Sequence, residues 1–298
     1  MRESTLTLGL PHTNRWGLAE DALMKHAGHL QWSAIAETIG TPLSRLRTLD
    51  GGEVYATFYF VEDTFPDAAP IESFQLDDTV RFRLALRAFK NLAVEGRIEF
   101  DRAEHLPAGA ATSASGSHPS IRFGNIFITP RGGNSLLKVA APANGDFSAF
   151  VPLPNEENPY QITRGASTTH RLGIVPDEWI AADGDGIEAF YAIDPDRDTN
   201  GAGLVYFANY FAFLEGAERS AAARSTLPAV RDAHARHLRV RRTAFYGNID
   251  LDDRLKTTVS FFPSPADPAV AGVRYAMRRE SDDVLICLSE AIKRCAGA

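Results

Sequence analysis

The sequence predicts an α+β protein made of two tandem copies of one unit, each a buried helix followed by an antiparallel sheet. The hexapeptide TNRWGL begins at Thr13 and the similar TNGAGL begins at Thr199; both run into an apolar segment of helix length. The motif QLDDTV (75–80) returns in the same order as DLDDRL (250–255). The residues after both copies of this second motif alternate between apolar and polar, which is typical of strands in the same register.

The Leu-Asp-Asp motif lies further from the Thr-Asn motif in the first copy than in the second, and a longer loop in the first copy would explain the difference. We place that loop at 62–73, EDTFPDAAPIES, because this stretch is rich in turn-forming residues. The alternative is a coincidence between two common turn-to-strand patterns. With two copies, the domains are expected at 1–150 and 160–298, joined by the proline-containing segment 143–161.

The first copy is expected to contain one helix followed by five strands. Residues 17–40 carry an approximate helical stripe of apolar residues that ends at Gly40. The low-complexity stretch 106–120 is expected to be a loop. The strand patterns lie at 53–61, 79–89, 94–101, 121–129 and 135–140.

The second copy is expected to open with a strand over 187–194. The helix expected over 203–223 is apolar on nearly all sides in its first three turns, so other parts of the protein must surround it. A long antiparallel sheet curled round one central helix is the hot-dog fold, and two in tandem make a double hot dog. The remaining strands are expected at 239–249, 254–262, 270–278 and 284–289, before a short C-terminal helix.

Charge and composition restrict the functional class. The net charge of −7 argues against a nucleic-acid partner. The basic run at 231–242 is expected to be the solvated side of an element; alternatively, it meets the phosphates of coenzyme A or an acidic carrier protein. Cys287 and Cys295 have no metal-ligand spacing, so no metal site is expected. Without a signal-peptide core or a long uninterrupted apolar run, the protein is expected to be cytoplasmic, with no membrane partner.

The segment DTNGAGLVYFANYFAFLEGAE (198–218) resembles the signature of hydroxybenzoyl-CoA-type hot-dog thioesterases. The resemblance implies a catalytic Asp before the central helix, whose N-terminal N–H groups hold the thioester carbonyl. Here Asn200 takes the position of that Asp, and Asn14 is its counterpart in the first copy. An amide cannot accept a proton as a carboxylate does, so hydrolysis by an Asp base is in doubt in both copies. The alternatives are that Asp198, off register, substitutes as the carboxylate, or that Thr-Asn only caps the helix.

The N-terminal segment 8–32 is similar to the start of the LnmK-like bifunctional acyltransferase/decarboxylases of polyketide biosynthesis. This resemblance implies that the protein decarboxylates a methylmalonyl-type CoA thioester, passes the acyl group to an acyl carrier protein and relies on an active-site tyrosine. No cofactor is expected beyond the coenzyme A of the substrate, and the expected assembly is a homodimer of double hot dogs. The matched elements are Gly9-x-Pro11-His12, Gly17-Leu18, Glu20, and Leu23 with the stretch from Gly28 to Trp32.

Tyr55 is the candidate for the implied tyrosine, and Tyr59 is the alternative. Both lie in EVYATFYFV (53–61), where strand alternation predicts that Tyr55, Thr57 and Tyr59 share one face, while Val54, Ala56, Phe58 and Phe60 share the other. The competing explanation is that these tyrosines only pack at the sheet surface.

Decarboxylation needs donors for the enolate oxygen and a weakly solvated carboxylate. We expect a helix N-terminus at Gly17 or Gly203 to bind the enolate, and Tyr55 to orient the carboxylate or protonate the carbanion. His12 is expected to assist Asn14 or only to pack. Additional substrate-binding candidates are Asn125 beside Gly124, the pair Asn134-Ser135, and Arg242 in the basic run.

Acyl transfer also needs a nucleophile, and the sequence shows no dedicated Ser-His-Asp or Cys-His pair. Direct attack by the carrier thiol and a tyrosyl ester both remain open. The alternative functions are a plain acyl-CoA or acyl-carrier thioesterase and a catalytically silent module that binds acyl carriers.

Overall fold

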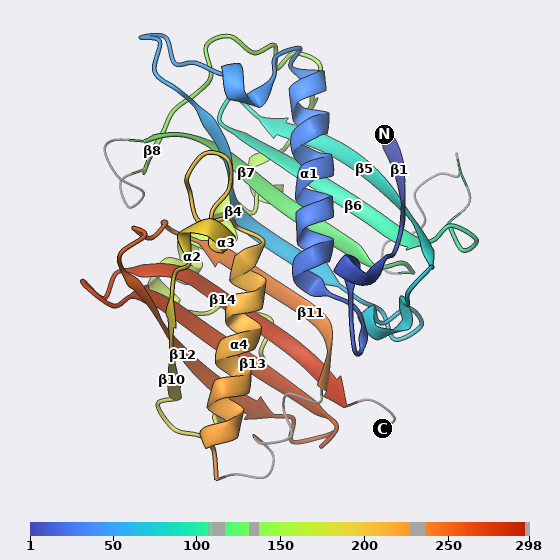
Figure 1. Cartoon of the computed structure of the whole chain (residues 1–298), viewed down its shortest axis with the longest axis vertical. Helices are drawn as coiled ribbons and strands as arrows, with labels where there is room; N and C mark the ends of the chain where they lie inside the picture. The colour runs from blue at the N-terminus through green and yellow to red at the C-terminus, as the bar shows by residue number, and fades with distance from the viewer. Residues whose placement is uncertain (107, 109–116, 131–136, 227–229, 231–235, 296–298) are drawn as a thin grey trace. The chain divides into compact units, whose positions relative to one another are not determined.

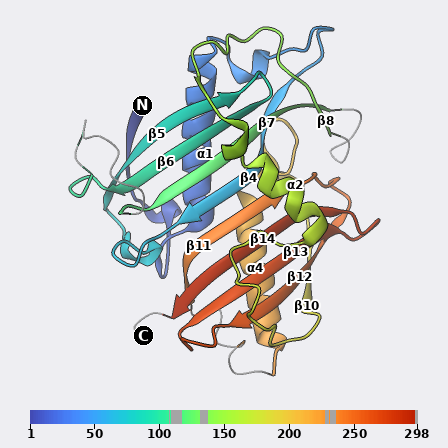
Figure 2. The ribbon, with the colours of Figure 1, turned by 180° about the vertical axis from the view of Figure 1, so that it is seen from behind.

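The computed structural model describes residues 1–106, 108, 117–130, 137–226, 230 and 236–295. The chain separates into two compact units, Met1–Gln161 and Ile162–Ala298. In each unit one long helix lies against one face of an antiparallel sheet, and the view from behind shows the strands in front of that helix (Figures 1 and 2).

The first unit is built around helix α1 (Glu20–Thr38), which follows the small hairpin of β2 (Thr13–Asn14) and β3 (Gly17–Leu18). The main sheet has the spatial order β1 (Arg2–Thr7), β5 (Thr79–Phe89), β6 (Ala93–Arg102), β7 (Ser120–Pro130) and β4 (Tyr55–Thr64). Two short strands extend this sheet: β8 (Leu137–Val139) pairs with β7, and β9 (Val151–Pro152) pairs with β5.

The second unit repeats this arrangement around helix α4 (Asn209–Arg224), which follows the short α3 (Pro195–Asp198). Its sheet has the spatial order β10 (Ile187–Ala192), β12 (Arg254–Pro263), β13 (Val270–Arg279), β14 (Leu285–Cys295) and β11 (Arg236–Phe245). Chain order and spatial order therefore correspond element by element in the two units. The predicted double hot-dog fold is confirmed.

The strand register also matches between the copies. Val80 of β5 lies opposite Leu6 of β1, and Leu255 of β12 lies opposite Tyr191 of β10. Val80 and Leu255 both stand at the same short distance after the Leu-Asp-Asp motif of their copy. The repeated motif therefore starts the same strand in each sheet, as the sequence predicts.

The extra length of the first copy is divided between two connections. The β4–β5 connection occupies 65–78, whereas its counterpart between β11 and β12 occupies only 246–253. The connection from α1 to β4 occupies 39–54, which is also longer than the 225–235 connection between α4 and β11. The single loop predicted at 62–73 therefore supplies only part of the extra length.

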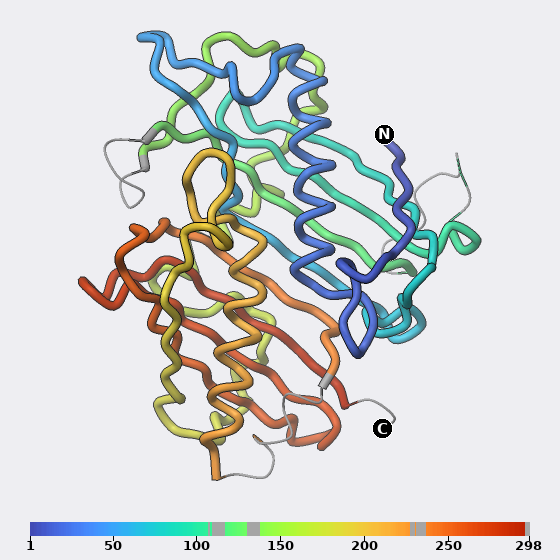
Figure 3. The backbone as a smooth tube through the Cα atoms, viewed as in Figure 1, coloured from blue at the N-terminus to red at the C-terminus, as the bar shows by residue number. Residues whose placement is uncertain are grey.

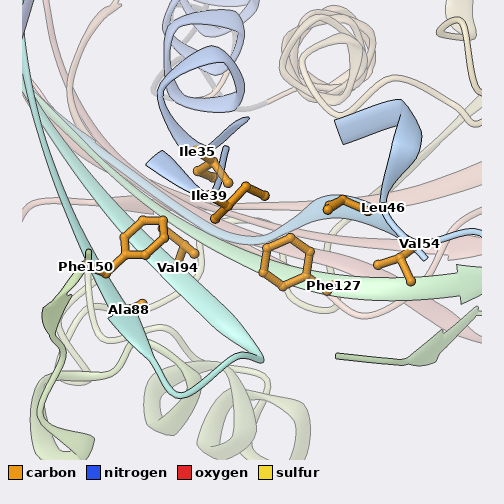
Figure 4. Packing of buried hydrophobic residues seen from close by; sticks show 8 residues of the cluster. All are labelled: Ile35, Ile39, Leu46, Val54, Ala88, Val94, Phe127 and Phe150. Atoms are coloured by element: carbon orange, nitrogen blue, oxygen red, sulfur yellow. The ribbon is translucent and has the colours of Figure 1, made fainter. Parts of the chain in front are cut away.

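An apolar cluster fixes the start of β4 against the C-terminal end of α1. Ile35 of α1 and Ile39, which caps the helix, pack with Leu46, Val54 and other buried residues (Figure 4). Burying side chains of this size stabilises the fold by about 1.5–3 kcal/mol each. The residue that follows Val54 therefore lies at the C-terminal end of this helix.

Several element boundaries differ from the prediction. The central helices begin at Glu20 and Asn209, because the residues just before them form turns. The expected C-terminal helix is wrong, since β14 continues to Cys295 with its pairing to β11 intact. An unpredicted helix, α2 (Tyr160–Thr169), begins at the end of the predicted linker. Of the strand expected at 135–140, residues 137–139 form β8 and the pair Asn134-Ser135 lies outside the described residues.

Candidate functional site

A compact turn that starts with the repeated Thr-Asn pair precedes each central helix (Figure 3). In the first turn, Thr13 pairs with Leu18 and Asn14 pairs with Gly17. In the second turn, Thr199 bridges to Val205, and the N–H of Asn200 donates to the Leu204 oxygen at 2.9 Å. The second turn is thus one residue longer, and Leu204 rather than Gly203 takes the register position of Gly17.

Both asparagines hold their own turn together. The Oδ1 of Asn14 accepts a hydrogen bond from the Trp16 N–H at 2.8 Å. The Oδ1 of Asn200 accepts from the N–H groups of Ala202 at 2.9 Å and Leu204 at 3.3 Å. These are Asx turns, which asparagine forms readily. Within the described part of the chain the Nδ2 group of Asn200 has no partner, so it remains a hydrogen-bond donor for a ligand.

The helix-capping alternative is wrong for both asparagines. The N-cap residues are Ala19 for α1 and Ala208 for α4, and neither has a side-chain capping bond. Gly17 and Gly203, expected at the helix N-termini, instead lie in the turns before them. At the start of α4, the N–H groups of Asn209 and Tyr210 donate to the Tyr206 and Phe207 oxygens at 3.0 and 3.2 Å, so the helix end acts through its partial positive charge.

Asp198 lies at the base of the second turn and is fully engaged. It is 2% exposed and accepts hydrogen bonds from the Tyr191 hydroxyl at 2.7 Å, the Asp194 N–H at 2.9 Å and the Arg197 Nε at 3.1 Å. Burial favours a higher pKa, but the hydrogen bonds from Arg197, the Asp194 N–H and Tyr191 outweigh it and lower the pKa of Asp198. Burial and the Asp198 charge raise the pKa of Tyr191 to about 12. This buried carboxylate is therefore engaged by three donors at the base of the turn.

The two turns differ in how closely the fold packs on their glycines. Gly17 has φ +136°, and a Cβ there would lie 2.8 Å from the Phe74 oxygen and 2.9 Å from the Glu72 oxygen. The β4–β5 connection therefore packs against the base of the first turn, and Gln75 Nε2 also donates to the Trp16 oxygen at 3.3 Å, while Asn14, Arg15 and Trp16 are exposed. A Cβ at Gly203 would meet no described heavy atom within 4 Å.

The two helix ends also differ in charge. The first turn of α1 contains Glu20 and Asp21, whereas the first turn of α4 contains no acidic residue. Carboxylates offset the positive end of a helix dipole and repel an anionic ligand. The open turn and the helix end of the second unit, residues 197–209, therefore form the better candidate site for an acyl thioester.

Tyr55 lies elsewhere in the first unit. It opens β4 beside the C-terminal end of α1, and its hydroxyl donates to Glu53 Oε2 at 2.7 Å, which raises the pKa of Tyr55. Asn14 and His12 precede the other end of the same 19-residue helix, which is about 28 Å long at 1.5 Å per residue. The structure does not bring these three predicted catalytic residues together within the first unit.

A β-bulge at Tyr59 changes the predicted faces of β4. Phe58 lies opposite Asn125 and Phe60 lies opposite Gly124. Because Asn125 and Gly124 are neighbours in β7, they point to opposite faces, and so do Phe58 and Phe60. The prediction that both phenylalanines share a face is wrong, since the bulge inserts one unpaired residue between them.

Tyr59 is packed beneath the linker. It is 7% exposed, its hydroxyl donates to Asn158 Oδ1 at 2.9 Å, and burial raises its pKa. Its ring lies directly over Gly124, where a Cβ would come within 2.6 Å of it. These contacts match the packing alternative for this tyrosine.

The other predicted ligand-binding residues make contacts within the fold. Asn125 is fully buried, and its Nδ2 donates to the Thr57 oxygen at 3.3 Å. Arg242 Nη1 donates to the Leu172 oxygen at 2.6 Å, which fixes the segment after α2 to the second sheet. His12 Nδ1 accepts from the Gly9 N–H at 2.9 Å.

The basic run does not form a solvated surface as a whole. Arg241 is completely buried, against the expectation, and its guanidinium lies 5.3 Å from the centre of the Tyr275 ring. Residues 231–235 lie outside the described residues. Alternating strand positions explain the burial, because every second residue of β11 points toward α4.

Sequence reasoning missed the polar residues buried in the middle of both helices. Gln31 donates to Asn125 from α1, and its side chain fills the space that a Cβ at Gly96 would need. Glu218 of α4 accepts from Tyr275 Oη at 2.5 Å and Lys293 Nζ at 2.6 Å. Gln31 and Glu218 occupy corresponding positions once the extra residue in the second turn is counted. A polar residue at one buried position of each helix is the signal that alignment of the copies could have revealed.

Two kinds of feature are absent from the described residues. Among them, no group of three or more His, Cys, Asp or Glu side chains is arranged to hold a metal ion. None of the helices that the structure describes combines the length and the apolar character that a membrane span requires.

Solved structures similar to this chain are double hot-dog proteins. A 12:0-ACP thioesterase from Umbellularia californica has a TM-score of 0.67 at 10% identity, covering 98% of this chain and 93% of its own. A putative oleoyl thioesterase from Lactobacillus plantarum has a TM-score of 0.66 at 12% identity, covering 99% and 96%. An acyl-ACP thioesterase from Bacteroides thetaiotaomicron has a TM-score of 0.60 at 11% identity, covering 98% and 97%. No family model matches the sequence, and no curated protein matches it. These likenesses establish the double hot-dog fold.

Proposed function

We propose that the protein decarboxylates a methylmalonyl-type CoA thioester and transfers the resulting acyl group to an acyl carrier protein. The observation that carries this proposal is the position and the hydrogen bonding of the two turn asparagines, Asn14 and Asn200. Each places an amide where the resemblance to hot-dog thioesterases implies a catalytic carboxylate, and each uses its oxygen to hold its own turn. A thioester bound there meets donors rather than a general base.

The second turn supplies the groups that decarboxylation requires. The Nδ2 group of Asn200 can donate to a thioester oxygen, and the partial positive charge at the start of α4 favours negative charge there, with no first-turn acid in α4 to oppose it. The bond between the carboxylate and the α-carbon breaks, CO2 leaves, and the electron pair moves into the thioester enolate. Proton uptake at the α-carbon then gives the propionyl thioester.

Transfer follows as a thioester exchange. The carrier thiolate attacks the propionyl carbonyl, and coenzyme A leaves as its thiol after protonation. The same donors stabilise the oxyanion of the tetrahedral intermediate. Asn200 and the α4 end therefore serve both steps. The role of Tyr55, to orient the carboxylate or protonate the carbanion, is carried over from the family resemblance.

The test is product analysis with methylmalonyl-CoA in the presence and absence of an acyl carrier protein. We expect CO2 and propionyl-CoA without the carrier, and propionyl-carrier with it. Methylmalonate plus free coenzyme A would contradict the proposal and indicate hydrolysis. Binding of the carrier with no turnover would instead indicate a silent module.

The alternative function is an acyl-CoA or acyl-carrier thioesterase. It is favoured by the fact that the three similar structures above are described as thioesterases. Against it stands the engagement of Asp198, the carboxylate nearest in sequence to Asn200, by three hydrogen-bond donors. We therefore rank hydrolysis second.

A further inference from the structure

We propose that Arg197 recognises the free carboxylate of the substrate at the open turn of the second unit. This inference rests on the proposed function, which requires a substrate with a carboxylate on its acyl group. The Arg197 side chain then selects carboxylated acyl thioesters over simple acyl thioesters.

The structure holds the Arg197 guanidinium in a fixed orientation. Its Nε donates to Asp198 Oδ1 at 3.1 Å, and its Nη2 donates to the Tyr191 hydroxyl. Asp198 is itself fixed, because its side chain is 3% exposed and it also accepts from Tyr191 and the Asp194 N–H. A planar guanidinium held along one edge presents its other edge to a carboxylate.

The free edge of Arg197 faces solvent beside the candidate site. The side chain is 64% exposed, and its Nη1 group has no partner among the described residues. The backbone oxygen of Arg197 accepts from Asn209 Nδ2 at 3.3 Å, which ties it to the first residue of α4. The adjoining Asp198 oxygen accepts from the Tyr206 N–H at 2.8 Å, at the base of the Asn200 turn. The cation therefore adjoins the same helix end and turn that supply donors for the thioester.

The first unit has no counterpart to this arrangement in its described residues. Since Thr13 corresponds to Thr199, Pro11 takes the position of Arg197 and His12 that of Asp198. The α1 end also carries two acidic residues. The recognition group is therefore specific to the open turn.

A weak ion pair between Arg197 and the substrate carboxylate suits decarboxylation, because the reaction removes that carboxylate. Arg197 shares its charge with Asp198 and faces water, so it attracts the carboxylate without holding it strongly. As CO2 leaves, the charge moves to the enolate and the ion pair is lost. An interaction of this kind lowers KM and does not raise kcat.

The test compares Arg197→Gln with the wild type on methylmalonyl-CoA and propionyl-CoA. We expect KM for methylmalonyl-CoA to rise about 5- to 10-fold, with kcat unchanged or higher, and Kd for propionyl-CoA to stay the same. Arg197→Lys, which keeps the charge but loses the fork, should give an intermediate KM. Arg15→Gln, an exposed arginine in the turn of the first unit, is the matched control and should change none of these values.

An unchanged KM in Arg197→Gln would overturn the inference, and so would an equal loss of affinity for both thioesters. A large fall in kcat would also contradict it. If the wild type does not decarboxylate, the proposed function fails, but Kd values for the two unreacted thioesters still test Arg197. If Arg197→Gln does not fold, Tyr191→Phe keeps the arginine but frees Nη2, and a KM about 2- to 3-fold higher for methylmalonyl-CoA alone is expected.

Discussion

Asn200 and Asn14 occupy equivalent turns that precede different helix ends. The Asn200 turn precedes a helix end without acidic residues in its first turn, whereas Glu20 and Asp21 follow the Asn14 turn. A carboxylate accepts the same turn hydrogen bonds as an asparagine oxygen, so Asp is tolerated at both positions.

Asn200→Asp is expected to convert the protein toward a hydrolase. The new carboxylate can act as a general base, and such groups typically contribute about 10²-fold or more to a rate. Release of free coenzyme A from propionyl-CoA, followed with a thiol reagent, should rise by about 10²-fold. Asn14→Asp is the matched control, and equal gains in both variants would show that the second turn has no special role.

Tyr55→Phe is expected to lower the decarboxylation rate by about 10²-fold while leaving the melting temperature close to that of the wild type. Among the described residues its hydroxyl bonds to Glu53, an exposed residue, so its loss has little effect on folding. Tyr59→Phe provides the comparison, because the buried bond to Asn158 is lost and the free energy of unfolding should fall by about 1–2 kcal/mol. Wild-type turnover in Tyr55→Phe would remove this residue from the mechanism.

At the level of elements, the two turns before the central helices differ in the space around their glycines. Gly17 has φ +136°, and a Cβ there would lie within 2.9 Å of two backbone oxygens, whereas Gly203 has φ +73° and open space. A residue with a Cβ is disfavoured at both φ angles, but only at Gly17 would this Cβ also clash with neighbouring atoms.

Gly17→Ala is expected to lower the free energy of unfolding by about 3 kcal/mol, against about 1 kcal/mol for Gly203→Ala. Urea denaturation of both variants measures the difference. Equal destabilisation would mean that the β4–β5 connection does not press on the first turn.

The sequence predicted which helices and strands form better than it predicted which residues pair within them. Two pairs of short motifs were enough to indicate duplication, because each recurs where the same element begins. The hexapeptide aligns Gly203 with Gly17, but backbone hydrogen bonds place Leu204 there. A one-residue difference in a turn follows from hydrogen bonding, which residue spacing does not reveal. The bulge at Tyr59 was hidden for the same reason, since strand alternation assumes an unbroken period of two.

The site was harder to predict than the fold. Asn200 was found because a resemblance marked its position, but Tyr191, Arg197 and Asp198 form a cluster only once β10 and α3 fold against each other. Asn125 and Arg242 looked like ligand-binding groups because the sequence alone does not show which polar residues fulfil one another's hydrogen bonds. Buried polar side chains usually do.

For the whole molecule, duplication provided two equivalent turns and the copies then diverged. The first unit has the longer connections and two acids at its helix end, while the second has an exposed turn, a helix end without first-turn acids and an arginine beside it. We therefore propose that the second unit supplies the donors to the thioester oxygen.

The most direct test follows wild-type protein and methylmalonyl-CoA in D2O by mass spectrometry, without a carrier. We predict propionyl-CoA that carries deuterium at the α-carbon, because the enolate takes its proton from solvent, with the bond to coenzyme A intact. Free coenzyme A and methylmalonate without loss of CO2 would contradict this mechanism.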